Sequence, residues 1–90
     1  MNGKYKIVII KAAQRDKEKI KAIPTLKKRV DEFLNILREN PYQNPPPYEK
    51  LQGNFKGAYS RRINRHHRLI YTVDEEKKAV KIVAMWTHYE

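Results

Sequence analysis

The central part of the chain combines one carboxylate with a cluster of basic side chains. Between Pro41 and Tyr71 the only acidic residue is Glu49, and a basic run occupies residues 60–68, while His88 stands near the end of the sequence. A carboxylate, several guanidinium groups and an imidazole are the groups needed to cleave an RNA phosphodiester by proton transfer without a metal ion, because RNA supplies its own nucleophile, the 2′-hydroxyl. This set gives the first hypothesis for the chemistry of the chain.

The charge of the chain favours a polyanionic partner. Its 90 residues include 20 Lys and Arg against 10 Asp and Glu, which gives a formal net charge of +10. A clustered basic surface binds phosphates and releases their counterions, so RNA, DNA and an acidic protein are all candidate partners. Lysine-rich helix surfaces that only face water are the alternative explanation, and composition alone does not separate the two.

Length and residue usage limit the remaining classes. Residues 1–90 suit a single domain, because a chain of this size cannot bury a second core. No cysteine is present, which excludes disulfides and thiolate metal sites. The apolar run at residues 7–10 is too short for a signal peptide or a membrane span. We therefore expect a soluble cytoplasmic protein with no membrane partner.

The first half of the chain reads as one strand and two helices. Residues 4–10 are short and β-branched, which predicts a strand, and residues 11–22 are rich in good helix formers. Pro24 suits the first turn of a second helix, and Asn40-Pro41 should end it. That helix has one apolar stripe with spacings of three and four residues, formed by Leu26, Val30, Phe33, Leu34 and Leu37.

The second half reads as strands. Pro45-Pro46-Pro47 should hold the chain extended where it reaches Glu49. Strand-like runs follow at residues 58–64, 67–73 and 79–88, with residues 74–77 as a polar hairpin loop between the last two. The predicted class is α+β: an N-terminal strand, two helices, then a three- to four-stranded largely antiparallel sheet with the helices on one face.

Strand alternation sorts the side chains into faces. Leu69, Tyr71 and Val73 should pack under the helices, while Arg62 and Arg68 should share the outer face, with Arg61 on the face opposite to Arg62. In the last strand, alternation groups Ile82, Ala84, Trp86 and His88 against Val83, Met85, Thr87 and Tyr89. Both groups are apolar in the middle, which predicts a central strand. The alternative role for the two arginines is a surface salt bridge with Glu49, worth at most about 1 kcal/mol each.

The basic half of the chain resembles a known family. The motifs that carry the resemblance are Tyr48-Glu49-Lys50-Leu51, Gly53-Asn54-Phe55-Lys56-Gly57, Tyr59-Ser60-Arg61-Arg62-Ile63, His67-Arg68-Leu69-Ile70-Tyr71 and His88-Tyr89. In this register the sequence resembles the Txe/YoeB family of bacterial toxins, which belongs to the RelE-like superfamily of ribosome-dependent mRNA endonucleases. The match is specific over residues 41–90 and loose over residues 1–40.

The resemblance implies a microbial RNase fold and cleavage of mRNA in the ribosomal A site. It assigns Glu49 as general base, Arg68 as the residue that stabilises charge, and His88 as general acid, with Arg62 and Tyr89 contacting the substrate. We expect Arg61, Arg65 and Lys50 to add contacts to the RNA. Gln52 departs from the pattern, because the family usually has lysine there.

No cofactor or metal is expected. His66 and His67 are adjacent and would point to opposite faces of a strand, and no cysteine or aspartate completes a set of ligands. The partners that the resemblance implies are a cognate antitoxin of the YefM/Axe type with an acidic flexible C-terminal segment, and the 70S ribosome with its mRNA; homodimers also occur in the family. The alternative function is a non-catalytic RNA-binding protein, or a ParE-like inhibitor of DNA gyrase, from the same superfamily.

Overall fold

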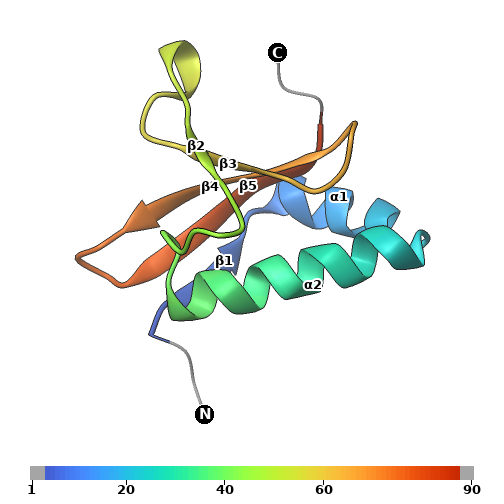
Figure 1. Ribbon diagram of the computed structural model, residues 1–90, viewed down its shortest axis with the longest axis horizontal. Coiled ribbons are helices and arrows are strands. Elements are labelled where there is room, and N and C mark those ends of the chain that lie inside the picture. Colours follow the sequence, from blue (N-terminus) through green and yellow to red (C-terminus); the bar gives the residue numbers. More distant parts are fainter. Residues whose placement is uncertain (1–3, 88–90) are drawn as a thin grey trace.

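Two helices cover one face of a five-stranded sheet in the computed structural model, which describes residues 4–87 (Figure 1). The strands are β1 (Lys6–Ile9), β2 (Glu49–Lys50), β3 (Tyr59–Arg62), β4 (Arg68–Asp74) and β5 (Ala79–Thr87). Their order across the sheet is β1-β5-β4-β3-β2, with β1 parallel to β5 and every other pair antiparallel. The predicted α+β class is confirmed, and the last strand, predicted to be central, has a neighbouring strand on each side.

The helices form where the apolar spacing predicts them. Helix α1 spans Lys11–Lys21 and buries Ala13 and Ile20, and helix α2 spans Pro24–Glu39. Pro24 occupies the first turn of α2, where its missing N–H has no intrahelical partner to lose. All five residues of the predicted α2 stripe are buried. Within residues 4–87, neither helix is long and apolar enough to cross a membrane.

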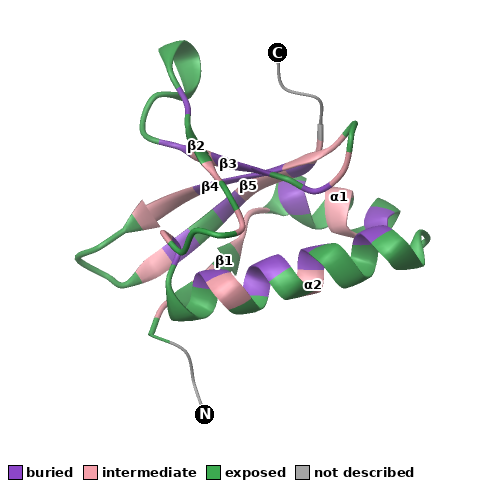
Figure 2. Ribbon diagram, in the orientation of Figure 1, coloured by how far each residue is buried: buried purple, intermediate pink, exposed green. Residues whose placement is uncertain are grey.

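The sheet carries a large core on its helix face and a small one on the other face. Buried residues of both helices pack with Leu69, Tyr71, Val80, Ile82 and Met85 in the large core (Figure 2). The small core contains Leu51, Ala58 and Ile70, with Val83 and Ala84 packed against them. The predicted positions of Leu69 and Tyr71 under the helices are confirmed, and Val73 packs against the same core.

The predicted face pattern of β5 is wrong, because the strand contains two irregularities. Its pairing moves from Ile82 opposite Tyr71 to Ala84 opposite Ile70, and then to Thr87 opposite Arg68. Each shift places one extra residue in β5, as in a β-bulge. Ala84 therefore packs in the small core, on the face opposite to Ile82. His88 and Tyr89, the last members of the predicted pattern, lie outside the described residues.

The polar hairpin loop between β4 and β5 anchors other parts of the chain. Its Glu75 carboxylate accepts hydrogen bonds from the Tyr5 hydroxyl at 3.0 Å and from the Tyr42 hydroxyl, and Lys78 donates to it at 2.9 Å. The hydrogen bond from Tyr42 is the main cause that lowers the pKa of Glu75 from 4.5 to about 2, and the bond from Lys78 adds to it. This carboxylate joins the hairpin to the residue before β1 and to the segment after α2.

We expect the Glu75 cluster to make stability depend on acid. Because the folded-state pKa of Glu75 is lowered, ionised Glu75 stabilises the fold above pH about 4.5, and this contribution is lost as the pH falls toward 2. The Glu75→Gln variant should therefore have a lower Tm than the wild type at pH 7, and the difference should shrink as the pH falls through this window. Thermal unfolding from pH 2 to 7 measures it, with the neighbouring exposed Glu76→Gln as the matched control. A Tm difference independent of pH would contradict this assignment.

Candidate active site

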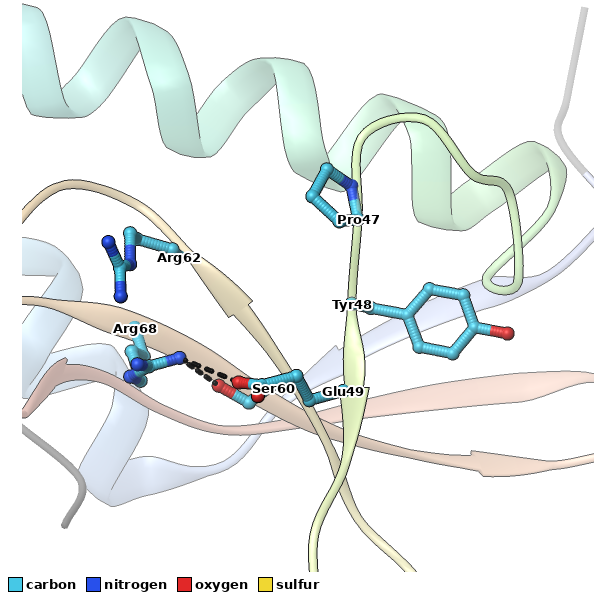
Figure 3. Close-up of a pocket in the computed structure, with 6 residues that line it drawn as sticks. All are labelled: Pro47, Tyr48, Glu49, Ser60, Arg62 and Arg68. Carbon is cyan, nitrogen blue, oxygen red and sulfur yellow. Dashed lines mark hydrogen bonds and ion pairs between the residues drawn. The ribbon is translucent and has the colours of Figure 1, made fainter.

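An open cleft lies where β2 joins the outer face of the sheet (Figure 3). It has a volume of about 410 Å³ and is lined by Pro47, Tyr48, Glu49, Ser60, Arg62 and Arg68. The two arginines come from β3 and β4, and the carboxylate comes from the two-residue strand β2. Groups on strands keep a fixed geometry before a ligand arrives, which suits them to hold an anion.

Strand register brings the charged side chains together. Glu49 pairs with Ser60 across β2 and β3, and Arg62 pairs with Arg68 across β3 and β4. Nη1 of Arg68 lies 3.1 Å from Oε1 of Glu49 and 3.5 Å from the Ser60 hydroxyl. In Figure 3 the Glu49 side chain points toward Arg68, while the Tyr48 ring points away from it. The salt bridge with Glu49 that was the alternative role for the two arginines is present for Arg68.

The cleft retains a positive charge after this pairing. Glu49 is its one acidic lining residue and neutralises one guanidinium, so the second one, from Arg62, keeps its charge available. The Glu49 side chain is 68% exposed and that of Arg68 is 23% exposed, so the arginine is held more firmly than the carboxylate. A phosphate could therefore bind both arginines while Glu49 turns to accept a proton.

Arg61 is not part of this cleft, and its expected role in contacting RNA is wrong. Its side chain is 0% exposed and faces the helix side of the sheet. Nε donates to the Tyr71 hydroxyl at 3.1 Å, and Nη2 donates to the carbonyl of Pro41 at 3.1 Å. Burial raises the pKa of Tyr71 to about 12, so its hydroxyl stays protonated and donates to the same Pro41 carbonyl at 2.9 Å.

The other predicted site residues lie outside the cleft or outside the described residues. Lys50 is exposed and lines a separate hollow beside Gln52, and Arg65 is exposed in the turn between β3 and β4. The ring of His67 stacks on that of Trp86 at 4.1 Å between centroids. Among residues 4–87, no three His, Cys, Asp or Glu side chains gather closely enough to hold a metal ion. His88 and Tyr89 follow the last described residue, Thr87.

Three residues that line the cleft were missed as members of the site: Pro47, Tyr48 and Ser60. Ser60 is 1% exposed and stands between Glu49 and Arg68, and Pro47 and Tyr48 line the cleft as the two residues before Glu49, with the Tyr48 ring pointing away from Arg68. Strand alternation puts Ser60 on the same face as Arg62. The missing information was strand β2, because two residues are too few to show a periodic pattern.

The fold and the cleft together define a small basic α+β protein with a carboxylate and two guanidinium groups in one open cleft. Residues 10–89 match the family model described as a YoeB-like toxin of bacterial type II toxin-antitoxin systems. Toxin YoeB of Escherichia coli strain K12 is 34% identical over 62 residues, which is 69% of this chain and 71% of that protein.

Two solved structures from Staphylococcus aureus share the whole architecture. A YoeB-YefM complex matches with a TM-score of 0.79 and 34% identity, covering 94% of this chain and 98% of the other. A YoeB dimer matches with a TM-score of 0.80 and 32% identity, covering 96% and 99%. The chain therefore belongs to the family of YoeB-like toxins of type II toxin-antitoxin systems.

We expect the cleft to contribute little to folding. The ion pair between Glu49 and Arg68 is partly exposed to water, and such pairs contribute about 0–1 kcal/mol. Glu49→Gln should therefore change the free energy of unfolding by less than about 1 kcal/mol in urea denaturation. Leu69→Ala, in the core, should cost about 2–5 kcal/mol in the same assay and serves as the positive control. A core-sized loss for Glu49→Gln would mean that Glu49 is a structural residue.

Proposed function

We propose that this chain is a ribosome-dependent mRNA endonuclease that cleaves the message in the ribosomal A site and so inhibits translation in the cytoplasm. The observation that carries the proposal is the contact of Glu49 with Arg68 at 3.1 Å, in a cleft that Arg62 also lines. Membership of the YoeB-like toxin family supports it, since the residues of the cleft fall in the motifs that resemble this family.

The reaction is a transesterification within the RNA. Glu49 accepts the proton of the 2′-hydroxyl, and O2′ attacks the adjacent phosphorus. The bond from phosphorus to O5′ breaks, and His88 donates a proton to the leaving O5′. The products are a 2′,3′-cyclic phosphate and a free 5′-hydroxyl, so the step needs no water, oxidant or metal. Acid and base groups of this kind contribute about 10²–10⁴-fold each.

Arg68 and Arg62 stabilise the charge that develops on the phosphorane. Arg68 is paired with Glu49 in the free protein, and the incoming phosphate takes over this guanidinium while Glu49 receives its proton. Charged donors fixed in advance at the place where charge develops can contribute several kcal/mol. The role of His88 as the acid comes from the family resemblance; the described part of β5 ends at Thr87, which pairs with Arg68.

The outer contacts to RNA come from residues around the cleft. Tyr89 stacks on an unpaired base, as aromatic residues do in single-stranded RNA recognition. Lys50 and Arg65 are exposed and bind phosphates farther from the reaction. Gln52 provides a neutral hydrogen-bonding group where the family usually has a lysine, which removes one phosphate contact.

A cognate antitoxin regulates this site. The S. aureus relative forms a complex with YefM, and another structure of that relative is a dimer. With a net charge of +10, this chain attracts an acidic flexible segment, which folds on binding and covers the cleft. We propose that this chain also forms a dimer.

The first test compares purified variants on programmed ribosomes, with the 5′ ends of the mRNA mapped. Glu49→Ala and His88→Ala should each lower the cleavage rate by about 10²–10⁴-fold. Arg68→Ala should lower it by about 10²–10³-fold. Lys50→Ala, the matched basic control on the neighbouring residue of β2, should lose much less. If the wild-type protein binds ribosomes and leaves the mRNA intact, the protein is a non-catalytic RNA-binding protein and not an enzyme. If His88→Ala cleaves at the full rate, His88 is not the general acid.

The second test concerns metals. A chelator selective for transition metals should leave the cleavage rate unchanged, with Mg²⁺ kept to preserve the ribosomes, because the scheme uses only side-chain acids, bases and cations. The rate is measured before and after addition of the chelator. Cleavage that stops and returns only with an added transition metal would refute the acid–base scheme.

A further inference from the structure

The guanidinium of Arg61 is buried with oxygen partners that carry no full charge. Its side chain is 0% exposed, and no ion pair within residues 4–87 includes it. A buried cation is costly unless hydrogen bonds replace its lost water. Three backbone carbonyls and one hydroxyl accept hydrogen bonds from its N–H groups. The positions of these acceptors show which segment Arg61 holds in place.

The three carbonyls belong to the segment that joins α2 to the cleft. Nη2 of Arg61 donates to Pro41 at 3.1 Å and to Gln43 at 2.9 Å, and Nη1 donates to Pro46. Pro45, Pro46 and Pro47 have no N–H, so this segment cannot be held by a normal ladder of backbone hydrogen bonds. The N–H groups of Arg61 instead hold the segment by donating to its carbonyls.

The contact continues to the residue beside Glu49. The guanidinium of Arg61 lies 5.0 Å from the centroid of the Tyr48 ring, and that ring meets Tyr59 edge-on at 5.6 Å. Successive side chains of an extended chain point to opposite faces. Because Tyr48 is fixed on the helix side against Arg61, Glu49 must point to the outer face, where Arg68 lies 3.1 Å away.

We propose that Arg61 is a positioning residue that fixes the face and register of Glu49 through the segment 41–48; as a role in catalysis, this rests on the proposed function. A lysine could not replace it, because one ammonium group lacks the planar fork that reaches several carbonyls at once. Arg61 and Arg62 thus serve the same reaction from opposite faces, the first by holding the base and the second by binding the phosphate.

The structural arm of the test needs no RNA. The amide of Leu51 donates to the carbonyl of Ala58 at 2.9 Å and reports on the pairing of the chain just after Glu49. In Arg61→Lys, hydrogen exchange at Leu51 should become about 10-fold faster or more, while amides of β4 and β5 keep their protection. Arg15→Lys, on the exposed side of α1, is the matched control. Unchanged exchange at Leu51, or an equal acceleration at all amides, would overturn the proposal.

The kinetic arm separates positioning from contact with RNA. Arg61→Lys should lower kcat by about 10–100-fold with the KM for ribosomes unchanged, since displacement of a catalytic group by about 1 Å has this effect. In a Glu49→Gln background the same substitution should change the residual rate by less than about 2-fold, because Arg61 acts through Glu49. A rise in KM with kcat unchanged, or an equal loss in both backgrounds, would contradict a positioning role.

A milder variant covers the case in which Arg61→Lys does not fold. Tyr71→Phe removes only the hydroxyl that accepts from Arg61 and donates to Pro41. It should give the same pattern of exchange and kinetics with smaller changes, and no change at Leu51 would overturn the proposal. If the wild type does not cleave mRNA, the proposed function fails while the exchange measurement still decides whether Arg61 holds Glu49.

Discussion

The buried charge of Arg61 is the constraint on which the arrangement of the cleft depends. A guanidinium that is 0% exposed must have its N–H groups satisfied inside the protein, and here the carbonyls of the 41–46 segment satisfy them. The segment has few N–H donors of its own because of its prolines. Arg61 supplies donors to the segment, and the carbonyls of the segment supply acceptors to Arg61. The exposed end of this connection is Glu49, whose position is therefore decided by contacts on the opposite face of the sheet.

Two neighbouring arginines show how strand alternation divides structural from chemical roles. Arg61 is buried among tyrosines and carbonyls, whereas Arg62 is exposed in the cleft beside Arg68. Four hydrogen bonds inside the protein hold the guanidinium of Arg61, whereas Arg62 lines the cleft with its donors available to an anion. In the pair Arg61-Arg62, the first arginine therefore serves the fold and the second is available to a ligand. Because Arg61 is buried, the net charge overstates the positive charge on the surface of the protein.

Periodicity accounts for what the sequence could predict. The stripe of α2 and the alternation of β4 extend over enough residues to define a face, and the resemblance to the YoeB family placed Glu49 and Arg68 together. Strand β2 has two residues and no pattern, so the pairing of Glu49 with Ser60 was not visible. Strand alternation had placed Arg61 on the face opposite to Arg62, and assigning it to the RNA from its residue type disregarded this; its partners are backbone carbonyls 15 to 20 residues away in the chain.

The shifts in β5 had no signal in the sequence, because every residue from Ile82 to Trp86 is apolar and fits either face. Their effect reaches the cleft. A straight continuation from the pair of Tyr71 and Ile82 would put Met85 opposite Arg68, whereas the two extra residues put Thr87 there. Asp16 of α1 accepts a hydrogen bond from the Met85 amide at 3.0 Å, within the irregular stretch. A helix on the inner face thus helps set which residue of β5 ends beside Arg68, just as Arg61 sets which residue of β2 faces it.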